Sequence, residues 1–79
     1  MEFQEFKDNF LELIWNPEDK TLRKGQSLMI FLHEIWSKEY HRISSMDYYP
    51  EKNIDCFYND KLIDNTFTHL EKEWKNYPN

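Results

Sequence analysis

Glycine is almost absent from this chain. There is one, Gly25, and only three prolines accompany it among 79 residues. A β-sandwich or β-barrel needs many chain reversals, and tight turns depend on glycine and proline. The scarcity of turn residues therefore favours helices. We predict an all-α fold, a small three- to four-helix bundle in which residues 1–79 form a single domain, because so short a chain has room for one core.

Aromatic side chains must supply most of that core. Six Phe, five Tyr and three Trp make up 18% of the residues, and each ring can bury roughly 150–250 Å². The one cysteine, Cys56, cannot form an internal disulfide. Packing alone is therefore expected to stabilise the fold.

Residues 2–15 have the spacing of an amphipathic helix. Apolar residues recur at steps of three and four, which predicts one buried face made of Phe3, Phe6, Phe10, Leu13 and Ile14. Pro17 disfavours helical geometry at Asn16, so the helix should end there.

The next segment is apolar around so much of its circumference that it should be the central helix. Its two overlapping stripes are Leu28, Phe31, Leu32 and Ile35, and Leu22, Met29, Leu32, Trp36, Tyr40 and Ile43. Two points stay open. Either Ser37 begins a separate short helix over 38–43 or the helix runs straight through. Gly25 either lets another backbone approach closely or lies in a frayed first turn.

A last helix is predicted after Asn59 or Asp60, either of which can cap it. Its buried face is expected to contain Ile63, Phe67, Leu70 and Trp74, at steps of four, three and four. Its water-facing residues should be Lys61, Asp64, Thr68, Glu71, Lys72 and Lys75.

Residues 44–59 show no clear period, and we interpret them as an ordered loop held by its aromatic side chains. Aromatic rings among acidic residues are typical of a surface that anchors a protein partner. The predicted partner-binding residues are Asp47, Tyr48, Tyr49, Glu51, Asp55, Tyr58 and Asp60. With a net charge of −5, the expected partner is a protein with a basic surface. The alternative is that Phe57 and at least one tyrosine fold inward and close the core.

Other chemistries find little support. His33-Glu34 lacks the second histidine one turn later that a zinc helix needs, and His41 would lie about 80° away round a continuous helix. Cys56 with His69 or His41 is the one conceivable nucleophile and base pair, without a local signature. We therefore expect no catalytic, metal or cofactor site and no enzymatic activity.

The distribution of charged residues favours neither nucleic-acid binding nor a membrane-spanning segment. Lys20, Arg23 and Lys24, with Lys38 and Arg42 along the same long helix, form the one basic cluster, and we interpret it as a solvated helix face rather than a nucleic-acid site. No window approaches the ~18 uncharged apolar residues of a membrane span. The acidic start of the chain is unlike a secretory signal, so a cytoplasmic location is expected.

Two resemblances emerge from the motifs. Arg23-x-Gly25-Gln26, then Leu32-His33-Glu34, then Asp55-x-Phe57-Tyr58-x-Asp60 with Ile63 and Trp74, resembles small uncharacterised helical proteins of bacteria and their prophages. That resemblance implies a helical fold and no particular activity. Phe10-Leu11-Glu12-Leu13 and Tyr48-Tyr49-Pro50 before a final helix with a Trp are similar to the immunity proteins of nuclease colicins. In that family the tyrosine pair contacts the toxin nuclease.

These observations favour a non-enzymatic binder. A small acidic protein with exposed aromatics suits the basic surface of a nuclease or other nucleic-acid-binding protein, where its carboxylates compete with phosphates. The leading hypothesis is an inhibitor from a phage or mobile element, such as an anti-CRISPR. The alternatives are an immunity protein of a nuclease toxin, a structural homodimer that covers the apolar surface of residues 28–36, or a direct nucleic-acid-binding module.

Overall fold

The computed structural model describes residues 1–45, 47–50 and 52–78 and contains no strand within these ranges, so the predicted all-α fold is confirmed. The four α-helices are α1 (Phe3–Asn9), α2 (Lys24–Ile35), α3 (Ser37–Ser44) and α4 (Ile63–Glu73). Three short turns extend them: the π-helical η1 (Phe10–Ile14) and the 3-10 turns η2 (Asp60–Leu62) and η3 (Trp74–Asn76). No helix in this part of the chain is long and apolar enough to cross a membrane.

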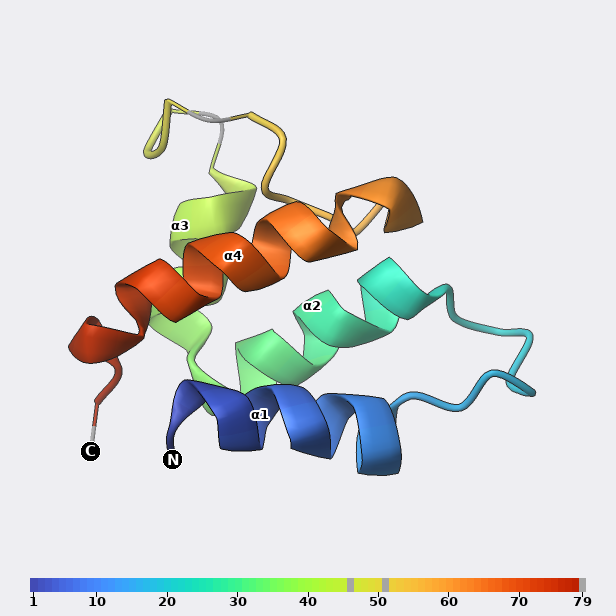
Figure 1. Ribbon diagram of the computed structural model, residues 1–79. Helices are drawn as coiled ribbons and strands as arrows, with labels where there is room; N and C mark the ends of the chain where they lie inside the picture. The colour runs from blue at the N-terminus through green and yellow to red at the C-terminus, as the bar shows by residue number, and fades with distance from the viewer. Residues whose placement is uncertain (46, 51, 79) are drawn as a thin grey trace.

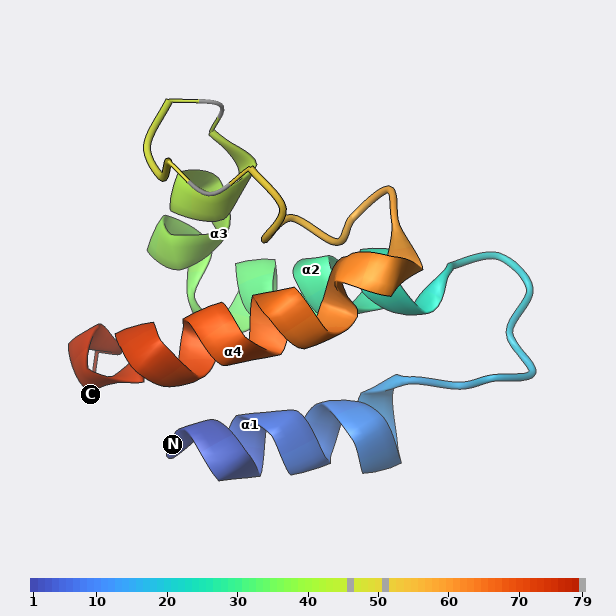
Figure 2. The same cartoon turned by 45° about the horizontal axis from the view of Figure 1, so that its top comes forward.

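The helices form one bundle with a crossing element. In Figures 1 and 2, α2 and α4 run in the same direction and α1 runs antiparallel to both, while α3 stands across them. The two termini lie at the same end of the bundle. Between α3 and η2, the described residues 45, 47–50 and 52–59 lie over the side opposite α1, and we call them the aromatic loop.

The predicted aromatic core is confirmed, and Trp74 lies at its centre. The Trp74 ring packs within 5.0 Å of Phe6 and 5.3 Å of Trp36, centroid to centroid, and Phe6 in turn stacks on Phe31 at 5.0 Å. The indole N–H of Trp74 donates a hydrogen bond of 2.8 Å to the carbonyl oxygen of Met1. The Trp74 side chain therefore joins α1, the α2–α3 junction and the end of α4, and Phe6 connects this group to α2.

The last helix has the predicted faces. Its four predicted core residues are all buried, and the six residues predicted to face water are exposed. The side chain of Asn59 accepts a hydrogen bond of 3.0 Å from the backbone N–H of Lys61, so Asn59 is the cap. The sequence did not indicate that Thr66 and His69 are buried on the same helix.

The predicted buried face of the first helix is wrong in its last turn. Leu13 is 77% exposed and Ile14 is 43% exposed, although Phe6 and Phe10 are fully buried. The backbone N–H of Trp15 donates to the carbonyl oxygen of Phe10, five residues back, at 2.8 Å. This π-helical turn is wider than an α-turn, so the residues after Phe10 leave the 3.6-residue repeat on which the prediction depended.

The central helix is interrupted at Trp36, so the alternative of a separate short helix is the one observed. Trp36 has a non-helical backbone conformation, with φ −145° and ψ 72°, between α2 and α3. Its ring is buried and packs against Trp74 and Tyr77. We infer that burial of this indole stabilises the break. The predicted basic line along one long helix, from Lys20 to Arg42, is therefore not formed.

Gly25 permits a close contact between backbones. A Cβ atom at this position would lie 2.1 Å from the carbonyl oxygen of Cys56. The N–H of Gly25 donates to Asp60 Oδ1 at 2.9 Å, and its carbonyl oxygen accepts from the Cys56 thiol at 3.4 Å. The Arg23 guanidinium donates to the carbonyl oxygen of Phe57 at 2.8 Å. Arg23 and Gly25 thus meet Cys56, Phe57 and Asp60 at one structural junction, which brings together parts of two motifs that are far apart in the sequence.

We predict that Trp74→Ala lowers the free energy of unfolding by about 3–5 kcal/mol, because it removes the ring at the centre of the core and leaves a cavity. That loss is comparable to the whole stability of many small domains. Urea unfolding followed by circular dichroism measures it. Tyr58→Ala, at a side chain that is 82% exposed, should change stability by less than about 0.5 kcal/mol. Near-native melting of Trp74→Ala would contradict the assignment of this core.

We predict that Gly25→Ala destabilises the protein by about 1–3 kcal/mol, because the added methyl group displaces the Cys56 carbonyl. A free helix position would instead gain about 1 kcal/mol from the same change. The matched control is Thr68→Ala on the exposed face of α4, which should be nearly neutral. A Gly25→Ala protein as stable as the wild type would show that the junction adjusts at no cost.

Candidate partner-binding surface

The aromatic loop is anchored by few side chains. Ile54 and Cys56 are buried, and Tyr49 and Phe57 are half-buried against the core. Tyr48 and Tyr58 instead face outward, at 54% and 82% exposed. The prediction that aromatic side chains hold the loop is therefore only partly right, because an aliphatic side chain and a thiol provide the buried anchors.

Tyr48 lies beside α3 and the C-terminal end of the chain. Its ring packs against Tyr49 at 4.9 Å between centroids, and the Arg42 guanidinium lies 5.3 Å from its ring centroid. These three residues line a groove of about 460 Å³ together with Trp36, Lys38, Glu73, Asn76 and Pro78. The groove combines aromatic surface with charges of both signs.

Tyr58 lies on the other side of α3. It packs against Phe57 at 4.7 Å between ring centroids and lines a smaller pocket of about 190 Å³ with Tyr40, Ser44 and Asp55. Tyr40 and Ser44 lie about 200° around the helix from Lys38 and Arg42, which line the Tyr48 groove. The structure therefore divides the predicted binding residues between two surfaces.

Three of the four predicted acidic residues are described, and two of them have structural roles. Asp55 Oδ1 accepts a hydrogen bond of 3.0 Å from the backbone N–H of Phe57, and Asp60 bonds Gly25 at the start of α2. Asp47 is exposed on the Tyr48 side. The fourth predicted acid, Glu51, lies outside the described residues. Asp47 thus provides the clearest free carboxylate next to an exposed ring.

A buried charged cluster, which the sequence analysis missed, lies directly beneath Tyr48. The side chain of Glu39 is fully buried. Its carboxylate accepts a hydrogen bond of 2.6 Å from the Tyr49 hydroxyl, contacts His69 Nε2 at 2.8 Å and pairs with Arg42 at 3.3 Å. The sequence spacing could have predicted the burial of Glu39. It follows Trp36 by three residues and precedes Ile43 by four, so it lies on the face that α3 buries.

The environment of this cluster shifts two pKa values. Burial raises the pKa of Glu39, but hydrogen bonds from His69, Tyr49 and Arg42 outweigh it and leave that pKa below its ordinary value of 4.5. Burial, together with the hydrogen bond to Glu39, raises the pKa of the Tyr49 hydroxyl. At neutral pH the cluster therefore holds an ionised Glu39 and a protonated Tyr49, and the latter is fixed as a hydrogen-bond donor.

The histidines and the cysteine considered for metal binding or catalysis have contacts that support the fold. The break at Trp36 brings His33 and His41 within 5.5 Å, ring to ring, but the described residues contain no group of three or more potential metal ligands. Cys56 bonds Gly25 while His69 contacts Glu39, so the two do not form a nucleophile and base pair. Burial raises the pKa of the Cys56 thiol to about 11, which disfavours a thiolate.

Comparison with known proteins gives no relative: no family model, curated protein or solved structure matches the chain.

We predict that Glu39→Gln lowers the free energy of unfolding at pH 7 by about 1–3 kcal/mol, because the hydrogen bonds to a charged acceptor are lost. The folded-state pKa of Glu39 lies below its unfolded value near 4.5. Its stabilising contribution is therefore complete above that value and is lost as the pH falls through the folded-state pKa. Urea unfolding at several pH values should show wild type and variant converging in acid.

The matched control for the Glu39 prediction is Tyr49→Phe. It removes one donor but leaves the carboxylate, so it should lower stability without abolishing the acid-dependent loss. A constant difference between wild type and Glu39→Gln from pH 7 to acid would show that the ionised carboxylate does not stabilise the fold.

Proposed function

We propose that this chain is a non-enzymatic acidic binding protein that attaches to the basic surface of a nuclease or other nucleic-acid-binding protein. The class that best fits is a phage or mobile-element inhibitor of a bacterial defence system, of which an anti-CRISPR is one kind. The observation that carries the proposal is the outward position of Tyr48 and Tyr58 on a protein with a net charge of −5.

The exposed tyrosine rings are unfavourable in the free protein and become favourable when a partner covers them. A tyrosine ring left in water keeps a large apolar area that binding can bury, and it has few rotatable bonds to lose. The Tyr48 ring is also supported from below, because Tyr49 and Arg42 are both held by the buried Glu39. Such a preorganised ring loses little entropy on binding. The net negative charge of the whole chain favours a partner surface that ordinarily contacts phosphates.

Contacts within the protein argue against the alternatives of a homodimer, a nucleic-acid-binding module and an immunity protein. Most of the apolar α2 surface that suggested a homodimer is covered within the monomer, where Leu28, Met29 and Leu32 are fully buried, and Ile30 alone among its large apolar residues is exposed. Two residues of the basic cluster, Arg23 and Arg42, are engaged within the protein, which weakens a direct nucleic-acid role. An immunity protein would use Tyr48 and Tyr49 together, and here the Tyr49 hydroxyl bonds Glu39. A cytoplasmic location fits a target of this class.

The test is affinity capture with the full chain from bacteria that carry a defence nuclease, followed by a cleavage assay on the captured enzyme. We expect capture of a nucleic-acid enzyme and reduced cleavage. Tyr48→Ala or Tyr58→Ala should weaken the binding by about 1–2 kcal/mol, depending on which ring contacts the partner. Glu71→Ala, on the exposed face of α4, is the control and should bind as wild type.

Two outcomes would contradict this proposal. Equal capture by wild type and by both tyrosine variants would show that the aromatic loop is not the contact surface. Capture of a nuclease whose cleavage rate does not change would rule out an inhibitor.

A further inference from the structure

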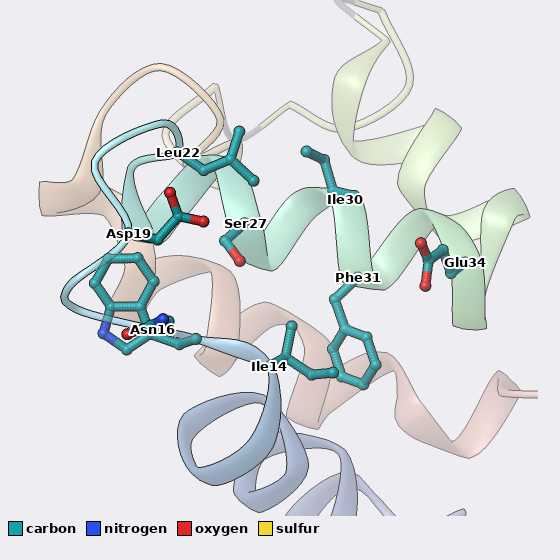
Figure 3. Close-up of a pocket in the computed structure, with 9 residues that line it drawn as sticks. Ile14, Asn16, Asp19, Leu22, Ser27, Ile30, Phe31 and Glu34 are labelled. Atoms are coloured by element: carbon teal, nitrogen blue, oxygen red, sulfur yellow. The ribbon is translucent and has the colours of Figure 1, made fainter.

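A second apolar surface is formed by η1, the chain that follows it and α2 (Figure 3). The exposed large apolar side chains of these segments are Leu11, Leu13, Ile14 and Ile30, and of these Ile14 and Ile30 line a pocket. The first three stand on η1, whose π-helical turn takes Leu13 and Ile14 out of the core. The deviation that made the helix prediction wrong therefore creates this surface.

A pocket of about 200 Å³ opens within this surface, and we call it the η1–α2 pocket. Its apolar walls are formed by Ile14, Trp15, Leu22, Ile30 and Phe31. In Figure 3 the Ile14 side chain and the Phe31 ring face each other across the space between η1 and α2. A cavity of ~150 Å³ already accommodates a benzene ring. The η1–α2 pocket therefore has room for one aromatic or leucine-sized side chain.

The charged residues that line the η1–α2 pocket are both acidic. Asp19 and Glu34 lie at its opposite ends (Figure 3). Asp19 Oδ1 accepts hydrogen bonds from the backbone N–H and the hydroxyl of Thr21, at 2.8 and 2.6 Å, and these bonds hold the pKa of Asp19 below its ordinary value. Glu34 is exposed on α2. An apolar space bounded by fixed negative charge is complementary to an apolar side chain flanked by basic ones.

We propose that the η1–α2 pocket docks a basic amphipathic segment of another protein, with one aromatic or leucine-sized side chain inserted and Lys or Arg beside Asp19 and Glu34. Burial of the inserted side chain supplies the affinity, and the carboxylates set its orientation and the rate of association. This surface is distinct from the aromatic loop, so the inference goes beyond the proposed function. A second copy of the chain fits less well, because two facing pockets would bring four carboxylates together on molecules of net charge −5.

The probe for this proposal is a synthetic amphipathic peptide of Leu and Lys with a single Phe, titrated into the full-length protein. Its matched comparison is the same peptide with Glu in place of Lys. Two-dimensional amide NMR locates the binding and calorimetry gives the dissociation constant. We expect the Lys peptide alone to bind, with shifts concentrated in residues 11–15 and 27–34 rather than at Tyr48 or Tyr58.

Two pairs of variants make the test specific. Ile30→Ser, which removes an exposed wall of the pocket, should weaken peptide binding at least ~tenfold, whereas Tyr58→Ser, on the aromatic loop, should have no effect. Glu34→Lys should weaken it ~threefold to fivefold, while Glu71→Lys, with the same net charge, should change it less than ~twofold. Circular dichroism confirms that each variant is folded.

Three results would overturn the proposal. One is equal loss of binding in Glu34→Lys and Glu71→Lys, which would indicate unspecific charge attraction. Another is a set of shifts centred on the aromatic loop. The third is self-association in sedimentation experiments that Ile30→Ser abolishes, which would make a second copy the occupant. Because the variants of the aromatic loop and of the pocket are separate, failure here is distinguishable from failure of the proposed function.

Discussion

The packing of aromatic rings around Trp74 is the interaction on which the rest of this structure depends. The chain has no internal disulfide to hold it, and aromatic rings from α1 and from the α2–α3 break pack against this one indole. The hydrogen bond from the same indole to the carbonyl oxygen of Met1 fixes the start of the chain against the end of α4. Large rings let a small core bury enough apolar area to offset the conformational entropy lost on folding.

Two polar clusters then position the surfaces around that core. At the start of α2, Gly25 leaves room for the backbone of Cys56 and its N–H donates a hydrogen bond to the Asp60 carboxylate, which fixes the end of the aromatic loop near Tyr58. On the buried face of α3, Glu39 accepts a hydrogen bond from Tyr49 and pairs with Arg42, and the Tyr48 ring packs against both. Each exposed tyrosine therefore stands on an internally bonded support. Such support favours binding, because the free protein already presents the ring in place.

The described part of the molecule presents three separate outward-facing surfaces. The Tyr48 groove and the Tyr58 pocket lie along the aromatic loop, and the η1–α2 pocket opens between η1 and α2 (Figure 3). The two sets of variants described for these surfaces test them separately.

The sequence by itself determined the helical fold, the aromatic core and the faces of α4, because these depend on local spacing and on composition. Tertiary structure alone decided where the helices deviate or break and which charged residues are buried. The π-helical turn that exposes Leu13 reflects how α1 ends against α2, and the break at Trp36 accompanies the packing of its ring on Trp74. Glu39 and His69 are 30 residues apart, so no local pattern could pair them. A charged side chain is buried only where distant donors converge on it, and that convergence exists only in the folded chain.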